Sequence, residues 1–408
     1  MPVEIRTVRP NEFEGYVDAV STGFIDRPNV ARLAEVVAPF WQLDRTWGAW
    51  DGDRCVGTWR SWGTELTVPG GAQVPAAAVS AVTVSPTHRR RGLLKGMTAA
   101  AHRAIRDGGE ALAILWASEY PIYSRFGYGP ATRTATWSVQ TRSTSFTGAP
   151  VSGIELVTPS PETRDIIRDV FERWRVRQPG EVRRLPNRWD DYLGLVESPW
   201  GHTWKGFLAL HRDGSGAVDG FARYSGEERW TDRQPDMTIK VNELHALTPE
   251  AYHALWRFVG EIDLATMVVA ENRRVSERMP WMLTNQRAAV LSGVGEALWV
   301  RVFDVVRALV ARSYERSGRL VLEVVDPEVP APIRVALDAT PDGATCRRSD
   351  HSPDLTLPIA ALGAAYLGGT RLRDIVLGTG ADEHRSGALA EADALFRTVD
   401  EPWCTTNF

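Results

Sequence analysis

The stretch that most constrains the fold is VSAVTVSPTHRRRGLLKGM, at residues 79–97. Residues 79–84 alternate as in an extended strand, and the Ser-Pro pair that follows ends this strand. Residues 93–106 then recur with helical spacing. A strand, a short loop and a helix N-terminus form an anion site, because free backbone N–H groups and the helix dipole point out of the loop. We therefore predict that this stretch binds a phosphate-bearing ligand.

The loop between that strand and that helix is basic. Arg89, Arg90 and Arg91 carry charge that suits a diphosphate. Gly92 has no Cβ to block a phosphate. The loop is neither a Walker loop nor a three-glycine dinucleotide fingerprint. It resembles the pyrophosphate loop of the GCN5-related N-acetyltransferases, Arg/Gln-x-x-Gly-x-Gly/Ala, with Leu94 at the last position. The alternative is a solvated basic turn before a surface helix.

Composition limits the partners of this loop. The 408 residues carry a formal net charge of -4, so the arginines suit a small polyanion better than a nucleic acid. Cys55, Cys346 and Cys404 form no CxxC pair or Cys/His cluster, so we expect no metal site and no disulfide framework. A reduced, cytoplasmic location fits this cysteine usage. The sequence has no apolar signal segment and no run of about 20 apolar residues, so we expect neither a signal peptide nor a membrane span.

Residues 1–148 are expected to form one domain around the opening stretch. An Asp-Gly turn at 51–53 predicts a hairpin, and the apolar run at 111–117 predicts a buried central strand. The other expected elements are strands at 3–8, 66–74 and 131–139, and helices at 10–24 and 30–40. This order of strands and helices is that of the GCN5-related acetyltransferases.

Residues 149–292 repeat the pattern in a weaker form. The sequence predicts a hairpin over 204–224, a strand at 241–247 and an amphipathic helix after it. This copy lacks the basic loop and carries acidic Glu250 where phosphate charge would lie. We predict a degenerate acetyltransferase-like domain that does not bind coenzyme, with two unrelated α/β domains as the alternative.

The remaining residues, 293–408, do not repeat the pattern of strands and helices of the two preceding domains. A strand running into a helix is expected over 299–311, followed by shorter strands and helices. The last seven residues, from Pro402, have no helical pattern and are expected to be extended.

Three segments together resemble one subfamily. They are residues 81–97, the run ASEYPIYSRFGYGPAT at 117–132, and a terminal domain that ends in a bare Phe408. This combination resembles the enhanced intracellular survival (Eis) proteins, which are multi-acetylating aminoglycoside N-acetyltransferases.

The resemblance implies a fold class and an assembly. The fold is α/β (α+β), with a catalytic acetyltransferase domain at 1–148 and a degenerate one at 149–292. A sterol-carrier-protein-like domain at 293–408 follows, and its C-terminus returns to the active site. The implied assembly is a homohexamer built as a trimer of dimers.

The resemblance also implies acetyl-CoA as the cosubstrate, without a metal. The backbone of Val82 and Val84 would pair with the pantetheine arm like an added strand, and an amide there would face the thioester oxygen. A strand edge that splays at this point would make room for the cosubstrate. The residues implied to bind acetyl-CoA are Val82, Val84, Arg89, Arg90, Arg91, Gly92, Leu93 and Ser118.

The implied general acid is Tyr123, the first tyrosine of IYSRFGYG. An unperturbed phenol, with a pKa near 10, stays protonated at neutral pH and can donate to the leaving thiolate. From the residues alone, Tyr120 and Tyr128 compete with Tyr123, and each of the three could be a packed aromatic side chain.

The implied general base is the terminal carboxylate of Phe408. A terminal carboxylate is ionised at neutral pH and can accept an ammonium proton, directly or through water. The alternative is a frayed tail. Apolar Trp403 and Phe408, with no charged residue after Glu401, argue against fraying.

Phe24, Asp26 and Glu119 are the expected substrate-binding residues. Polycationic amines favour carboxylates at the mouth of a site, which Asp26 and Glu119 would supply, and the alternative for both acids is solvated surface charge. Asn407 stands where the family often has an acidic residue, which removes one negative charge. We expect direct attack by the amine in a ternary complex. The alternatives are a protein lysine or small polyamine as acceptor, a lipid-binding module with a vestigial acetyltransferase half, and a structural assembly protein.

Overall fold

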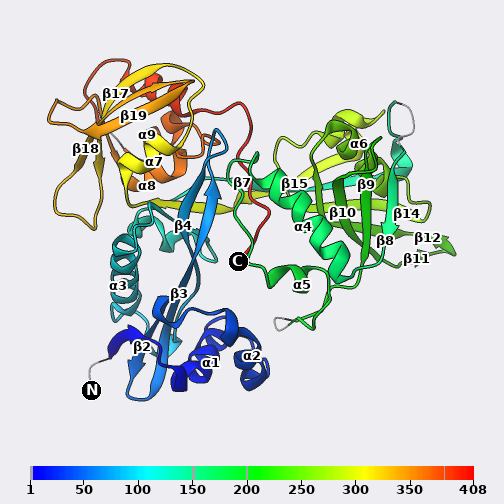
Figure 1. Cartoon of the computed structure of the whole chain (residues 1–408), viewed down its shortest axis with the longest axis horizontal. Helices are drawn as coiled ribbons and strands as arrows, with labels where there is room; N and C mark the ends of the chain where they lie inside the picture. The colour runs from blue at the N-terminus through cyan, green and yellow to red at the C-terminus, as the bar shows by residue number, and fades with distance from the viewer. Residues whose placement is uncertain (1–2, 149–151, 199–200, 381) are drawn as a thin grey trace. The chain divides into compact units, whose positions relative to one another are not determined.

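The computed structural model describes residues 3–148, 152–198, 201–380 and 382–408 (Figure 1). They form two compact units. The first unit comprises the chain up to Thr132, Leu298–Asp400 and Asn407–Phe408, and the second comprises Arg133–Ala297 and Glu401–Thr406. No helix in the described part of the chain has both the length and the apolar character that a membrane crossing requires.

The first unit is built on a seven-stranded sheet with the order β1-β2-β3-β4-β5-β16-β6. Its strands are β1 (Glu4–Thr7), β2 (Thr46–Asp51), β3 (Arg54–Thr67), β4 (Gln73–Val84), β5 (Leu112–Trp116), β6 (Tyr128–Pro130) and β16 (Leu298–Val302). The hairpin predicted at 51–53 joins β2 to β3. The separate strand expected at 66–74 is wrong. Gly70 and Gly71, with φ of +92° and +84°, turn the end of β3 directly into a long β4.

Helices cover both faces of this sheet. α1 (Phe13–Gly23) and α2 (Val30–Val37) lie on one side of the β3–β4 pair, and α3 (Leu93–Asp107) lies on the other (Figure 1). Ala81 of β4 packs in the cluster under α1 and α2, whereas Ala77 and Val79 pack under α3. Two hydrophobic clusters therefore sandwich the sheet. Residues 77, 79 and 81 would share one face of a regular strand, so Ala81 faces the other cluster because β4 is irregular at this residue.

The C-terminal domain of the first unit has a five-stranded sheet in the order β19-β18-β17-β20-β21. Its elements are α7 (Val305–Ala311), β17 (Gly318–Val325), β18 (Ile333–Thr340), β19 (Gly343–Arg348), β20 (Leu355–Pro358), α8 (Ile359–Ala365), α9 (Leu372–Thr379), β21 (Asp382–Glu383) and α10 (Ala388–Phe396). Helix α8 lies directly on β6 and β16. A Cβ at Gly129 would stand 2.0 Å from the Ala360 carbonyl oxygen, and one at Gly363 would stand 2.2 Å from that of Val300.

Glu328 ties this C-terminal domain to α3. Its carboxylate lies 2.7 Å from Nδ1 of buried His102 and 2.5 Å from the Arg106 guanidinium. Nε2 of His102 lies 3.0 Å from the hydroxyl of Tyr128. Burial opposes ionisation of Glu328, but the hydrogen bonds with His102 and Arg106 and the charge of Arg301 outweigh it and lower the Glu328 pKa to about 2.

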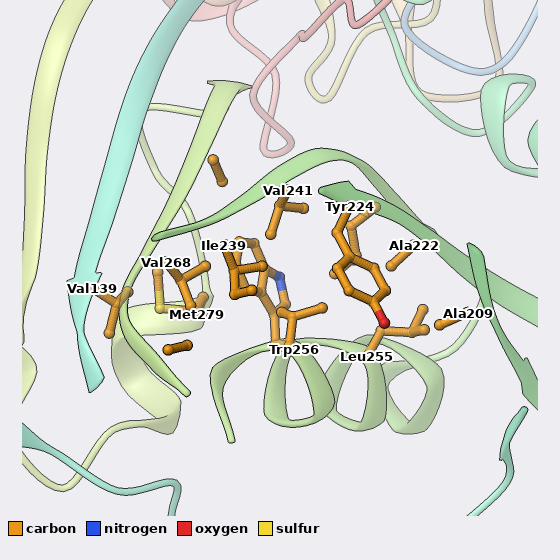
Figure 2. Packing of buried hydrophobic residues seen from close by; sticks show 14 of the residues in the cluster. Val139, Ala209, Ala222, Tyr224, Ile239, Val241, Leu255, Trp256, Val268 and Met279 are labelled. Atoms are coloured by element: carbon orange, nitrogen blue, oxygen red, sulfur yellow. The ribbon is translucent and has the colours of Figure 1, made fainter. Parts of the chain in front are cut away.

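The second unit holds a seven-stranded sheet in the order β15-β7-β14-β13-β10-β9-β8. Its elements are β7 (Arg133–Gln140), β8 (Ile154–Val157), α4 (Pro161–Arg175), α5 (Arg188–Tyr192), β9 (Phe207–Arg212), β10 (Val218–Glu227), β11 (Trp230–Thr231), β12 (Gln234–Pro235), β13 (Met237–Ala246), α6 (Pro249–Gly260), β14 (Ala265–Arg273) and β15 (Ala289–Glu296). Trp256 and Leu255 of α6 fill the core against the sheet (Figure 2).

Two strands are exchanged between the sheets. The strand expected at 131–139 exists as β7, but it pairs with β14 and β15 of the second sheet instead of ending the first. Figure 2 shows its Val139 beside Val268 in the second core. The strand expected from 299 onward exists as β16, but it pairs with β5 and β6 of the first sheet. The predicted placement of each strand in its own domain was therefore wrong. A local sequence pattern predicts a strand but carries no information about the strand with which it pairs.

Candidate active site

The parallel pair β4–β5 splits part-way along its length. Ala76–Val79 of β4 pair with Leu112–Leu115 of β5, and β4 then continues to Val84 without pairing to β5. Val82 and Val84 lie in this unpaired length. Their half-buried side chains pack on the cluster under α3, which leaves their backbone as the group available to a ligand.

A bulge bends β4 at the start of the split. The register with β3 shifts between Thr58 and Arg60, and Ala81 opposite them has φ of +53°. The Thr58 hydroxyl donates a hydrogen bond to the Ala81 carbonyl at 2.8 Å. A bulge increases the local bend and twist of a strand, so it turns β4 away from β5 at this point.

The basic loop ends in an open helix N-terminus. Gly92 is the N-cap of α3 with φ of +79°, a conformation that favours glycine, and no side chain caps this end of the helix. A Cβ at Gly92 would meet no atom within 4 Å. The first-turn N–H groups therefore remain available for an anion.

The three arginines of the loop are exposed. Within the described ranges Arg89 and Arg90 form no ion pair or hydrogen bond, and Arg91 donates only to the Thr87 carbonyl, at 3.3 Å. The site thus combines free guanidinium groups with a helix N-terminus. Leu93 is buried in the cluster under α3, so only its backbone can serve the site.

Sequence reasoning missed the residue that anchors this loop. His88 is buried, its Nε2 lies 3.1 Å from the Asp51 carboxylate, and its Nδ1 lies 2.8 Å from the Thr87 hydroxyl. Asp51 belongs to the β2–β3 turn, so the contact fixes the loop against the sheet. The sequence marks His88 only as one more basic residue.

Tyr123 lies between two 3₁₀ turns, Tyr120–Ile122 and Ser124–Phe126. It is 9% exposed, and no described residue hydrogen-bonds to its hydroxyl. Burial, and then the charge of Glu119, raises its pKa to about 12. By contrast, Tyr120 is 56% exposed, and the buried Tyr128 hydroxyl is engaged by His102. Of the three candidate tyrosines, Tyr123 alone combines burial with a free hydroxyl.

Phe408 packs on the face of the first sheet that lies opposite the α3 cluster of Tyr123. Its ring stands 5.3 Å from that of Trp62 on β3, edge to face. Trp62 pairs with Ala78, whose neighbours Ala77 and Val79 face α3, so Trp62 faces the α1–α2 side. The Arg60 guanidinium, between the rings of Trp62 and Trp41, agrees with this assignment.

The expected substrate residues fall into two groups. The first, Phe24 and Asp26, follows α1 and is exposed. A Cβ at Gly23 would stand 2.4 Å from the side chain of Thr83, so the end of α1 lies on β4 between Val82 and Val84. The second group is Glu119 alone, which is exposed on the segment after β5 beside the exposed acetyl-CoA candidate Ser118. Both groups thus border strands that form the split.

Three stretches of the chain match known families. Residues 4–131 and 180–303 each match an acetyltransferase (GNAT) domain, and residues 305–405 match a sterol carrier protein domain. The N-acetyltransferase Eis of Mycobacterium tuberculosis is 35% identical over 362 residues, which are 86% of this chain and 82% of that protein.

The chain belongs to the Eis family of N-acetyltransferases.

Two further proteins match over the full length. An uncharacterized N-acetyltransferase of Streptomyces griseus is 40% identical over 418 aligned residues, which cover 100% of both chains. The crystal structure of Eis1 from Mycobacterium abscessus is 32% identical, with a TM-score of 0.86 over 100% of both chains. The predicted fold class of two acetyltransferase-like domains and a sterol-carrier-like domain is confirmed, and the GNAT domains imply the use of acetyl-CoA.

Proposed function

We propose that this N-acetyltransferase transfers acetyl groups from acetyl-CoA to the amines of aminoglycosides or similar polyamines, by direct attack in a ternary complex. The observation that carries the proposal is the split between β4 and β5, with an uncapped helix N-terminus at its end. Tyr123 reaches the sheet from the α3 face, and Phe408 reaches it from the α1–α2 face.

The residues of the first unit fit acetyl-CoA. The unpaired length of β4 offers main-chain groups of Val82 and Val84 to an extended pantetheine arm. The three exposed arginines and the N-terminus of α3 fit a diphosphate, since open space lies in front of Gly92. Leu93, through its backbone, and Ser118 complete the proposed set. When bound, acetyl-CoA would supply an acetyl group activated as a thioester.

Tyr123 is the proposed general acid. A phenol with a pKa of about 12 keeps its proton throughout the neutral range. With no partner among the described residues, its hydroxyl is free to donate that proton to a leaving thiolate.

The terminal carboxylate of Phe408 is the proposed general base. The contact with Trp62 restrains the ring next to this carboxylate. A carboxylate on the α1–α2 face can accept the proton of an ammonium group that enters past Phe24 and Asp26. Attack from this face and protonation of the thiolate from the other need no covalent enzyme intermediate.

The acceptor is proposed to be polycationic, because Asp26 and Glu119 place exposed carboxylates beside the split. Asn407 is exposed and uncharged, so we expect weaker attraction of polycations than an acidic residue would give. A protein lysine or a small polyamine is the alternative acceptor.

We propose that the second acetyltransferase-like domain binds no coenzyme. Its helix α6 corresponds to α3, but the Thr248 hydroxyl accepts a hydrogen bond from the Ala251 N–H at 3.1 Å and so caps this N-terminus. Glu250 adds negative charge in the same turn. These contacts support catalysis by the domain within 1–148, with a degenerate domain within 149–292 and the sterol-carrier-like part within 293–408. A homohexamer, as a trimer of dimers, and a cytoplasmic location complete the proposal.

The test is release of the CoA thiol from acetyl-CoA with tobramycin, kanamycin, spermidine and a lysine peptide as acceptors. Turnover that is fastest with the aminoglycosides supports the proposal. If spermidine or the peptide is turned over faster, the acceptor is instead a small polyamine or a protein lysine. If no amine is turned over, the proposed reaction is contradicted.

A further inference from the structure

The segment Glu401–Thr406 is held by the second unit along its whole length. The backbone N–H of Trp403 donates to the Pro179 carbonyl at 2.9 Å, and its indole N–H donates to the Asn272 carbonyl at 2.8 Å. The Trp403 ring is 2% exposed and packs against Trp174, with the ring centroids 5.5 Å apart. This segment is therefore an integral part of the second unit and not a loose tail.

The buried carboxylate of Glu181 binds Thr405 and Thr406 at the end of this segment. Glu181 is fully buried and accepts hydrogen bonds from the Thr405 N–H at 2.8 Å, the Thr405 hydroxyl at 2.8 Å and the Thr406 N–H at 3.3 Å. The N–H of Val182 donates to it as well, at 3.0 Å. Burying a carboxylate costs folding free energy unless hydrogen-bond donors surround it. These four contacts therefore form a preorganised binding site for the end of the segment.

Arg184 holds the same two residues from the other side. Its Nε donates to the Thr406 hydroxyl at 3.0 Å, and its Nη2 donates to the Thr405 hydroxyl at 3.2 Å. The guanidinium is itself fixed by an ion pair with Glu243 and lies 3.8 Å from the centre of the Phe171 ring. Thr405 is thus held through its backbone and its side chain at once.

The last of these contacts is at Thr406, two residues before the terminal carboxylate. Two residues span about 7 Å at most, so holding Thr406 limits how far the carboxylate of Phe408 can move from it. We propose that Glu181, with Arg184, is a positioning residue that holds the C-terminal segment so that its carboxylate serves as the base. This inference rests on the proposed function. It gives the second acetyltransferase-like domain a task that needs no coenzyme.

We call the contacts of Glu181 and Arg184 with Thr405 and Thr406 the clamp. The clamp can be tested without any activity assay. In Glu181→Gln, one carboxylate oxygen becomes an amide N–H₂ that cannot accept from Thr405 or Thr406. Amide hydrogen exchange of the peptide that carries Thr405 and Thr406 should then be at least tenfold faster than in the parent protein. Glu250→Gln, the same change at an exposed position of the same unit, should leave this exchange unchanged. Equal exchange in the parent and in Glu181→Gln would overturn the clamp.

Positioning of the base predicts a particular pH dependence. A misplaced base matters most where the amine is protonated, so kcat/KM for tobramycin in Glu181→Gln should fall at least tenfold at pH 7 and less than threefold at pH 9.5. The dissociation constant for CoA should not change. A loss of equal size at both pH values would overturn the positioning role, since a merely structural defect has no reason to follow the protonation of the acceptor.

Two further results separate the possible failures. If Glu181→Gln does not fold, as judged by its thermal melt, Thr405→Val tests the same clamp from the tail side, and unchanged exchange there would overturn it. If the parent protein acetylates no amine, the proposed function and the positioning role both fail, while faster exchange in Glu181→Gln would still support the clamp.

Discussion

The ring of Phe408 meets the indole of Trp62 edge to face, with the centroids 5.3 Å apart. This contact places Phe408 on the α1–α2 face of the first sheet, against Trp62 of β3, which pairs with Ala78 of β4. Tyr123 packs in the cluster on the other face. The proposed acid and the proposed base thus lie on opposite faces of the first sheet.

The contact with Trp62 should matter for the rate. Edge-to-face aromatic pairs contribute about 0.5–1.5 kcal/mol, so Trp62→Leu should lower kcat/KM for an amine roughly two- to tenfold at pH 7. Trp62→Phe keeps an aromatic ring and should stay closer to the parent enzyme. If both variants lose activity equally, the aromatic contact does not hold the terminus.

Tyr123→Phe removes the proposed acid while keeping the packed ring. We expect kcat to fall by about 10²–10⁴, with little change in the dissociation constant for CoA. Tyr120→Phe, at an exposed position, should keep most of the activity. Because burial raises the Tyr123 pKa to about 12, the parent enzyme should lose no activity to ionisation of this phenol below about pH 11. Unchanged kcat in Tyr123→Phe would assign the acid to another group.

The loop glycine can be tested with a control from the same helix. Gly92 and Gly109 flank α3, have φ of +79° and +78°, and would both place a Cβ in open space. Each change to Ala should lower the free energy of unfolding by about 1 kcal/mol through backbone strain. Isothermal titration should show weaker CoA binding, by roughly tenfold, for Gly92→Ala alone. Equal effects on binding would contradict a coenzyme site at the loop.

The ion pair between α3 and the C-terminal domain makes stability depend on pH. The folded-state pKa of Glu328, about 2, lies below its ordinary value of 4.5. Its contribution is therefore fully present above pH 4.5 and is lost as the pH falls through 2. Glu328→Gln should lower the free energy of unfolding by about 2 kcal/mol at pH 7, allowing for partial solvent exposure. Denaturant titrations should show this difference shrinking below pH 4.5, and a constant difference would contradict the assignment.

Local features of the site were predictable from the sequence. The strand, the basic loop, Gly92 and α3 are adjacent in the chain, so their periodicity and turn residues describe them directly. The choice of Tyr123 needed the family resemblance, because burial and the engagement of Tyr128 by His102 are three-dimensional facts.

Long-range contacts were not predictable. The sequences of β7 and β16 have the pattern of ordinary strands. No feature of these local sequences indicates that each strand pairs in the sheet of the other domain. Glu181 is one acid among many in a charged segment, and its partners, Thr405 and Thr406, lie more than 200 residues away.

The role of the Phe408 carboxylate as the base can be tested by changing this group alone. A protein ligated to end in Phe408 carboxamide differs from the parent only in the charge and chemistry of the last group. We expect this protein to keep its melting temperature and its affinity for CoA but to lose at least 100-fold in kcat/KM for tobramycin at pH 7. Undiminished turnover by the carboxamide protein would show that the Phe408 carboxylate is not the base.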